Sequence, residues 1–441
     1  MHDENTARRL RTGDGGLDRR GFVGFAAGLV GCAAAALAGC APEGRGGSDE
    51  GADEGIATEN SDDGAASGEA EGVQQGEGAQ VPAVSEAAGG PEARIEEVLA
   101  SLSPYERVCQ LFFVTPEALT GVGQAVQAGD ATQQALRERP VGGLVYFSSN
   151  ILDETQFRSL IADTAAMEVP VPLWLGVDEE GGTLVARIAN SGVFDVPSFP
   201  DMAQIGAGGD ASQAFAVGDS IGAYLADIGF NIDFAPDADV LTNPENTSIG
   251  PRAFSSDPSV VAAMATEVAK GLQGRGVSAV SKHFPGHGDT AADSHSGEAV
   301  SNRTLEDLRA CEFVPFKATI EAGVDGVMVG HISTPNAAGD GLPASLSPVA
   351  IGQWLRGELA YDGVVFSDAM NMGAVTERFS PGDAAVAFLN AGGDVVLMPA
   401  DFGAALQGVL DAVESGSLSQ ERVDESVRRI LTAKLRRRIL Q

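Results

Sequence analysis

The chain has 441 residues, a length that fits one large domain or two to three smaller ones. It carries 62 acidic and 28 basic side chains, and its formal net charge of −34 argues against charge-driven binding of nucleic acid or of an anionic membrane surface. Part of this charge is local, because residues 41–90 alone contain twelve acidic residues and one basic residue, Arg45.

Residues 1–40 have the pattern of an export signal. Arg19 and Arg20, followed by Gly-Phe-Val, resemble the start of a twin-arginine signal. An apolar run rich in small residues follows, and the Leu-Ala-Gly-Cys at its end resembles a lipobox, in which Cys40 is lipidated and becomes the mature N-terminus. The alternative is an uncleaved transmembrane anchor, since the run is about as long as the shortest spans. The lipobox favours an exported protein, lipid-anchored on the outer face of the cytoplasmic membrane.

Residues 41–90 consist mainly of Gly, Ala, Glu, Asp, Ser and Gln and contain almost no large apolar side chains. Such a segment cannot bury enough surface to offset the entropy lost on ordering. We therefore expect a disordered acidic linker, with an acidic interaction tail as the alternative. From residue 91 the composition is that of a globular domain, which we predict over residues 91–441. The two cysteines in this domain, Cys109 and Cys311, are interpreted as buried thiols, with a disulfide between them as the alternative.

Eight short runs rich in Val, Ile, Phe and Leu follow one another along residues 91–441 and indicate buried strands. Helical patterns lie between most of them, for example at 212–228, 260–275 and 305–322. This alternation predicts a parallel sheet covered on both faces, and eight units predict an α/β fold of the (β/α)8 TIM-barrel type. A doubly wound open sheet is the alternative. The predicted strands are 110–114, 143–147, 173–177, 231–235, 277–281, 326–330, 363–366 and 394–398.

Polar and ionisable side chains recur where these predicted strands end. A single Asp or Ser at such a place is often only the N-cap of the next helix. Taken together they indicate a ring of ligands around one pocket, because the active sites of barrels lie at the C-terminal ends of the strands. The residues are Ser148, Ser149, Asn150, Asp178, Glu179, Glu180, Asp237, Lys282, His283, His331, Ser367 and Asp368.

The stretch from Lys282 to His295 contains three of the five histidines of the chain. An imidazole can give and take a proton near neutrality. Asp293, two residues before His295, can hydrogen-bond the other ring nitrogen, fix the tautomer and stabilise the imidazolium. A metal site is the main alternative for clustered histidine and aspartate residues.

The motifs KHFPGHG at 282–288 and DSH at 293–295 resemble the NagZ-type β-N-acetylglucosaminidases of glycoside hydrolase family three. Further motifs carry the same resemblance along most of residues 93–441. They are VDEEGG (177–182), NIDFAPDADV (231–240), IGPRAF (249–254), PASLSP (343–348), SDAMNM (367–372) and ESVRRIL (425–431).

The resemblance implies a catalytic role for three residues. Asp368 would be the nucleophile that forms a covalent glycosyl-enzyme, and the dyad of His295 and Asp293 would supply the acid and base. The sugar hydroxyls would be bound by Asp178, Arg187, Arg252, Lys282 and His283, although GGTLVARI is one residue longer before Arg187 than the common pattern. No metal and no cofactor is implied.

We therefore expect a retaining enzyme that removes terminal β-linked GlcNAc from muropeptides, chitooligosaccharides or glycan ends. A β-glucosidase or xylosidase of the same superfamily and a phosphorylase are the enzymatic alternatives. A neutral histidine repels phosphate less than a carboxylate does, so phosphate could replace water as the acceptor. From a different class, the chain could be a non-catalytic glycan-binding lipoprotein built on the same fold.

Overall fold

The computed structural model describes residues 90–291 and 297–441, which belong to one compact unit. The globular domain predicted over residues 91–441 falls within this unit. The predicted signal with Cys40, the predicted acidic linker, and both Asp293 and His295 lie outside the described residues.

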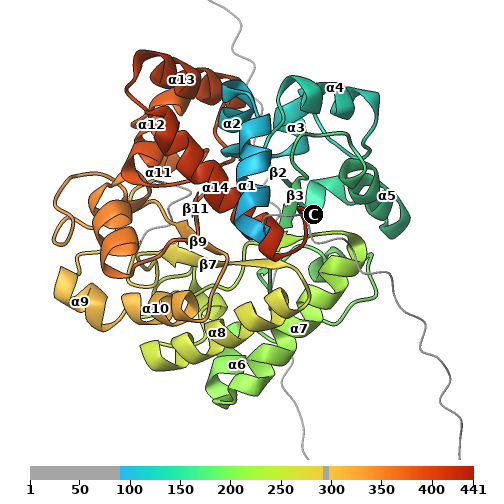
Figure 1. Cartoon of the computed structure of the whole chain (residues 1–441). Helices are drawn as coiled ribbons and strands as arrows, with labels where there is room; N and C mark the ends of the chain where they lie inside the picture. Colours follow the sequence, from blue (N-terminus) through green and yellow to red (C-terminus); the bar gives the residue numbers. More distant parts are fainter. Residues whose placement is uncertain (1–89, 292–296) are drawn as a thin grey trace, which may run out of the picture. The chain divides into compact units, whose positions relative to one another are not determined.

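Eight parallel strands form a barrel with helices around it (Figure 1). The strands are β1 (Phe112–Val114), β2 (Gly143–Val145), β3 (Trp174–Val177), β6 (Ile232–Asp233), β7 (Ser278–Phe284), β9 (Gly326–Val329), β11 (Val364–Ser367) and β12 (Val396–Leu397). Their order in the sheet is β11–β9–β7–β6–β3–β2–β1–β12. A parallel bridge between Phe366 of β11 and Val395, which precedes β12, joins the first and last strands of this order and closes the barrel. All eight predicted strands are present, so the barrel prediction is confirmed and the open sheet is excluded.

The barrel interior is filled by aromatic rings from several strands. Phe113 of β1 lies 5.3 Å from Phe234, which follows β6, and Phe234 lies 5.7 Å from Phe366 of β11, between ring centroids. Glycines on neighbouring strands make room for these rings. A Cβ added at Gly176 of β3 would lie 2.8 Å from the ring of Phe113. Large rings on some strands and glycines on others thus interdigitate, as close packing of the interior requires.

The helices cover the outside of the barrel, and many begin at a residue whose side chain caps the first turn, such as Asp153, Asp257 or Asp401. No helix in the described residues is long and apolar enough to cross a membrane. The helices are α1 (Gly90–Ser101), α2 (Pro104–Gln110), α3 (Pro116–Thr120), α4 (Asp130–Glu138), α5 (Glu154–Ala165), α6 (Met202–Gly208), α7 (Ala211–Ile228), α8 (Pro258–Gly274), α9 (Leu305–Ala310), α10 (Phe313–Glu321), the π-helix η5 (Val349–Glu358), α11 (Gly373–Thr376), α12 (Pro381–Ala391), α13 (Phe402–Ser415) and α14 (Gln420–Arg436). Short 3-10 turns are η1 (Ser148–Asn150), η2 (Ala189–Ser191), η3 (Gly250–Arg252) and η4 (Ala344–Leu346).

The helix predicted over residues 305–322 is interrupted, so that prediction was wrong in one respect. The structure has two helices, α9 and α10, separated at Cys311, whose φ of −129° and ψ of −77° are not helical. Pro315 explains the break, because it has no N–H to donate to the carbonyl of residue 311 and its ring would clash with that carbonyl. Cys311 is half-buried, Cys109 is buried, and both thiols are free.

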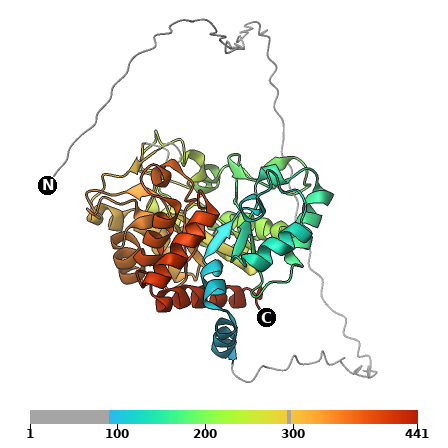
Figure 2. The same cartoon turned by 90° about the horizontal axis from the view of Figure 1, so that it is seen from above.

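Helices α1 and α14 lie at the end of the barrel where the strands begin (Figures 1 and 2). The buried Lys434 of α14 donates hydrogen bonds of 2.8 Å to the carbonyls of Gly142 and Pro172, which precede β2 and β3. Arg94 of α1 donates to the carbonyl of Gln441 at 2.9 Å. Both ends of the described chain therefore meet beneath the barrel, opposite the face where the strands end.

Two small sheets were not predicted from the sequence. The hairpin β4 (Glu179–Gly181) and β5 (Val185–Ala186) follows β3, and β8 (Ala299–Val300) pairs in parallel with β10 (Ile332–Ser333). The buried carboxylate of Glu179 fixes the hairpin, because it accepts hydrogen bonds from the N–H of Ile188 at 2.7 Å and from the hydroxyl of Tyr224 on α7 at 2.7 Å. Two residues important for the site, Glu180 and Arg187, are thereby held over the barrel.

Candidate active site

A cavity of about 410 Å³ opens where the barrel strands end. One part of its wall is apolar, with Phe147, Met372, Leu397 and Met398, and the rest is densely charged. The cavity brings together the predicted nucleophile and all five predicted sugar-binding residues. Its ionisable lining residues are Asp178, Glu180, Arg187, Arg252, Lys282, His283, His287 and Asp368.

Asp368 follows β11 and lies at the wall of the cavity. Its own N–H donates to the carbonyl of Val329 on β9 at 3.0 Å, so the backbone is still fixed by the barrel, and its carboxylate accepts from the N–H of Ala369 at 2.7 Å. Burial raises the pKa of this carboxyl, but His283, His331, the N–H of Ala369 and Lys282 together outweigh burial and leave the pKa below its usual value. Asp368 is therefore an ionised carboxylate that faces the cavity, as a nucleophile requires.

A group of two cations and two anions lines the side of the cavity near the ends of β3, β6 and β7, with Lys282 and Glu180 buried and Asp178 and Arg252 partly exposed. The ammonium of Lys282 lies 2.7 Å from both Asp178 and Glu180. The guanidinium of Arg252 binds both oxygens of Glu180, at 2.7 and 2.8 Å. Burial opposes ionisation of Glu180, but Arg252 and Lys282 outweigh it and lower the pKa of the carboxyl. Such charge-assisted groups can hold adjacent sugar hydroxyls in one orientation.

His283 lies beside this group, between the cavity and a buried carboxylate. Its Nδ1 is 2.7 Å from an oxygen of Asp239, and its Nε2 is 3.5 Å from the guanidinium of Arg252. Asp239 does not line the cavity and is fully buried. The peptide bond between Lys282 and His283 is cis.

Arg187 reaches the same cavity from the segment after the β4–β5 hairpin, despite the extra residue before it. Its guanidinium carbon lies 5.7 Å from the ring centroid of Phe147, a cation–π distance. Its Nε is buried and makes no hydrogen bond within residues 90–291 and 297–441. A buried donor of this kind at a cavity wall is available to a substrate oxygen.

The glycine-rich loop after β7 packs closely against the side chain of Glu312. Gly286 has a φ of +128°, and a Cβ there would lie 2.5 Å from the side chain of the buried Glu312. Burial raises the pKa of Glu312 to about 7. His287 lines the cavity, donates its N–H to Asp239 at 2.6 Å and pairs through Nδ1 with the hydroxyl of Thr290 at 2.8 Å.

His331 is buried behind the nucleophile rather than in the cavity wall. Its Nδ1 lies 2.7 Å from the hydroxyl of Ser345, and its Nε2 lies 3.0 Å from the carbonyl of Ala369. His331 therefore holds the loop that follows Asp368, and its prediction as one of the ligands around the pocket was wrong.

The predicted acid–base residues, Asp293 and His295, lie outside the described residues. The described loop residues on either side are anchored to the barrel. Asp289 accepts from the hydroxyl of Ser301 at 2.8 Å and forms an ion pair with Arg303 at 3.3 Å. The dyad thus stays a prediction.

A resident metal is not favoured by the described side chains. Asp237, Asp239 and His283 are the described residues that come close enough together to share a cation. However, His283 Nδ1 is bound to Asp239, and the other oxygen of Asp239 accepts the N–H of His287. Asp237 accepts the N–H of Asp239 at 2.9 Å and lies 3.4 Å from Arg252.

Sequence reasoning placed Glu180 among the strand-exit residues but gave it no role, and it did not single out Asp239. Glu180 is the anion shared by Lys282 and Arg252, and Asp239 is the partner of His283. Each stands in a motif with three acidic residues, VDEEGG and NIDFAPDADV. The signal available for them was an acidic residue a few positions after a predicted strand, and it did not identify their cationic partners, which are distant in the sequence.

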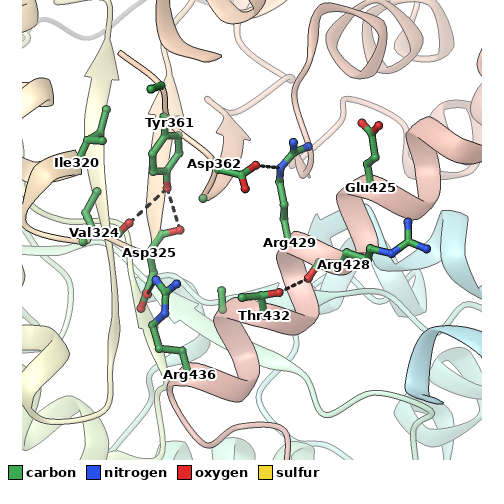
Figure 3. Close-up of a pocket in the computed structure, with 14 residues that line it drawn as sticks. Ile320, Val324, Asp325, Tyr361, Asp362, Glu425, Arg428, Arg429, Thr432 and Arg436 are labelled. Carbon is green, nitrogen blue, oxygen red and sulfur yellow. Dashed lines mark hydrogen bonds and ion pairs between the residues drawn. The ribbon is translucent and has the colours of Figure 1, made fainter. Parts of the chain in front are cut away.

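A second cavity, of about 500 Å³, lies at the opposite end of the barrel, beside α14 (Figure 3). Its charged groups already bind one another or the backbone: Arg429 binds Asp362 at 3.1 Å, and the hydroxyl of Tyr361 donates to the carbonyl of Asp325 at 2.9 Å. Arg428 is likewise paired with Glu96 of α1 at 2.6 Å. These contacts tie the base of the barrel together, so we interpret this cavity as structural.

Residues 106–433 match the family described as "Glycosyl hydrolase family 3 N terminal domain". The chain is 37% identical over 343 residues to beta-hexosaminidase LpqI of Mycobacterium tuberculosis, covering 76% of this chain and 84% of that protein. Among solved structures, a family 3 beta-N-acetylglucosaminidase from Paenibacillus is similar with a TM-score of 0.70 and 37% identity, over 77% of this chain and 63% of that one. The structure of M. tuberculosis LpqI is similar with a TM-score of 0.67 and 35% identity, over 77% of this chain and 96% of that one.

Proposed function

The chain belongs to glycosyl hydrolase family 3, and from this membership we propose that its cavity is the active site of a retaining exo-β-N-acetylglucosaminidase. The reaction class, hydrolysis of a glycosidic bond, follows from the family and from relatives that are named beta-hexosaminidases. The single observation that carries the assignment to this cavity is the ionised Asp368 facing the charged group of Lys282 and Arg252.

In the proposed mechanism an oxygen of Asp368 attacks C1 of the terminal sugar. The bond from C1 to the glycosidic oxygen breaks as the new bond forms, and the leaving oxygen takes a proton from His295. His295, now neutral, removes a proton from water, which attacks C1 and releases Asp368. Two inversions give net retention. Asp293 would hold the imidazole and stabilise its charged form.

The cavity supports a terminal sugar as the substrate. One wall offers Asp178, Lys282 and Arg252 to sugar hydroxyls, and the opposite wall offers the apolar side chains of Leu397 and Met398. A single ring can lie between these walls, with its hydroxyls at the charged side and an apolar face at the other. As the natural substrate we propose the β-linked GlcNAc ends of muropeptides or related glycans.

A fluorinated N-acetylglucosaminyl fluoride tests this proposal. It should accumulate as a covalent adduct whose proteolytic peptide contains residues 367–372, detected by mass spectrometry. An adduct on another carboxylate would overturn the assignment of Asp368. A panel of chromogenic β-glycosides, run with and without phosphate, should show a preference for β-GlcNAc and a rate that does not depend on phosphate.

For the location of the enzyme we propose export and lipid attachment at Cys40, which rests on the lipobox-like residues 37–40. The full chain, expressed in a bacterium that processes such signals, should partition with membranes. A Cys40→Ala variant should lose lipid incorporation, measured with radiolabelled palmitate. Equal labelling of both proteins would contradict the proposal.

A further inference from the structure

The partner of His283 suggests a role beyond packing. Asp239 is fully buried, and one oxygen of its carboxylate lies 2.7 Å from Nδ1 of His283. Its other oxygen accepts the N–H of His287 at 2.6 Å and lies 3.4 Å from the N–H of His283. Three contacts from one short loop thus fix Asp239, while the side chain stays behind the cavity wall.

This geometry places a proton on Nδ1 of the imidazole. An ionised carboxylate only accepts hydrogen bonds, so Nδ1 of His283 carries a proton and Nε2 is turned to the cavity. The acidic groups near this imidazole are Asp239, Asp368 and Asp237, and burial together with the charge of Asp239 raises the pKa of Asp237 to about 8. The cations are Arg252 and Lys282, whereas burial lowers the pKa of His287, which favours its neutral form. Asp239 is the one of these acidic groups at hydrogen-bond distance from the ring within the described residues.

We propose that Asp239 is a positioning residue that holds His283 as an imidazolium, so that a fixed positive charge and an Nε2–H donor face the sugar beside Asp368. This inference rests on the proposed function, because the positive charge of His283 is inferred to act in glycosyl transfer. The imidazolium keeps the nucleophile ionised and donates a hydrogen bond to a sugar hydroxyl. Lys282 and Arg252 share the anion Glu180, and Asp239 is the counter-ion of His283. Of these cations, His283 acts most strongly on Asp368.

The electrostatics agree in direction with this geometry. Burial lowers the pKa of His283, but the charge of Asp239, its hydrogen bond to the ring and the charge of Asp368 together outweigh burial and leave the pKa above the usual value. In turn His283 is the largest of the charges that lower the pKa of Asp368. As the pH rises through the raised pKa of His283, the imidazolium is lost. Removing the charge of Asp239 should lower that pKa and move the loss to a lower pH.

Asp239→Asn tests this, because the amide oxygen can still accept from Nδ1–H while the charge is gone. Its NH2 group then faces the N–H of His287, so the thermal midpoint of the variant is measured beside its activity. The substrate is an activated aryl β-GlcNAc, which needs little help from the general acid. In the plot of kcat/KM against pH, the decline at alkaline pH (the alkaline limb) should begin at a lower pH in the variant than in the wild type. At any pH above the limb, kcat/KM of the variant should be tenfold below that of the wild type for every pH unit by which the limb moves, and acidification should restore the activity. Asp239→Ala should lose the orientation as well, so its low activity should not recover at acidic pH.

Two further variants keep the test decisive. Asp239→Glu retains the charge at a changed distance and should keep the limb near its wild-type position while KM rises. Asp325→Asn removes a buried carboxylate at the opposite end of the barrel, paired there with Arg437, and should lower stability without moving the limb. If Asp239→Asn does not fold, the Glu variant still decides, since a limb that moves despite a retained charge contradicts the proposal.

A direct measurement separates this inference from the proposed function. The full chain has only five histidines, so the ring signals of labelled histidine can be assigned with His283→Gln and followed by NMR against pH. The pKa of His283 should fall in Asp239→Asn, and an unchanged value would overturn the inference. A wild-type chain that shows this dependence but does not hydrolyse β-GlcNAc would overturn the proposed function instead.

Discussion

Single side chains in the cavity owe their proposed roles to the charges around them, and Asp368 is the clearest case. Asp368→Asn keeps an oxygen that can accept the N–H of Ala369 but removes the nucleophilic charge. We expect turnover of chromogenic β-GlcNAc to fall to background while the thermal midpoint stays near that of the wild type. As a control, Asp362→Asn changes a carboxylate on the opposite face and should retain full activity. Substantial turnover by Asp368→Asn would remove the nucleophile from the mechanism.

His295 is tested by how much its loss depends on the leaving group. An alkoxide leaving from a natural disaccharide is a strong base and needs a proton, whereas a nitrophenolate leaves readily without one. His295→Ala should therefore reduce the glycosylation rate by about 10²–10⁴-fold on a sugar aglycone and much less on the aryl glycoside. Asp293→Ala should show the same pattern more mildly, because Asp293 orients the imidazole. Pre-steady-state rates on both substrates decide, and equal losses would mean that His295 binds the sugar instead.

The sequence predicted the residues of the cavity better than their connections. Motifs pointed to Lys282, Arg252 and Asp178, and all three line one cavity. The sharing of Glu180 by two cations depends on the register of β3, β6 and β7 across the barrel. Such contacts join residues about 70 to 100 positions apart in the chain, so neither a helical nor a strand period reveals them.

Whole elements of the barrel depend on the fit between rings and glycines. Gly176→Ala on β3 would place a Cβ 2.8 Å from the ring of Phe113 and 3.1 Å from Ile232. Overpacking of this kind should destabilise the fold by about 1–3 kcal/mol, measured by urea denaturation. A second substitution, Phe113→Leu, should recover part of the loss, because neighbouring sites are not additive. Gly274→Ala at the end of α8 meets nothing within 4 Å and serves as the matched control, so similar losses at both sites would contradict the packing argument.

The alternation of strands and helices was predictable because buried parallel strands are short apolar runs and the helices are amphipathic. The elements that escaped prediction depend on single residues or on tertiary partners. Pro315 divides the predicted helix at 305–322, and the two-residue strand β5 pairs only because Glu179 is held by Ile188 and Tyr224. Neither strand of that hairpin has enough apolar residues to give a periodic signal.

In the described part of the chain, one end of the barrel carries the candidate active site and the other end stabilises the fold. The end where the strands finish holds the cavity, and the end where they begin holds α1, α14 and their ion pairs. Buried Lys434 and the pair of Arg437 with Asp325 belong to the second end. Changes there should alter stability before they alter chemistry, as expected for the N-terminal face of a barrel.

The N-terminal segment provides the sharpest test of that division. Residues 41–89 contain few groups that could form a core, so deletion of residues 1–89 should leave a soluble enzyme with unchanged activity on small substrates. A longer deletion, through residue 102, also removes α1. That helix buries Ile95, Val98 and Leu99 against the core, and each apolar side chain of this kind is worth about 1.5–3 kcal/mol when fully buried.

The two truncations should therefore behave differently in thermal unfolding and in activity. The shorter one should melt at the temperature of the full chain. The longer one should melt several degrees lower, or unfold, because α14 loses its contacts with α1 and the carbonyl of Gln441 loses its hydrogen bond from Arg94. Triple substitution of Ile95, Val98 and Leu99 by Ala in the full-length chain should reproduce the lower melting temperature without removing any backbone. If the shorter truncation folds but loses activity on an aryl β-GlcNAc, the acidic segment contributes to the site, and the separation of the two ends of the molecule does not hold.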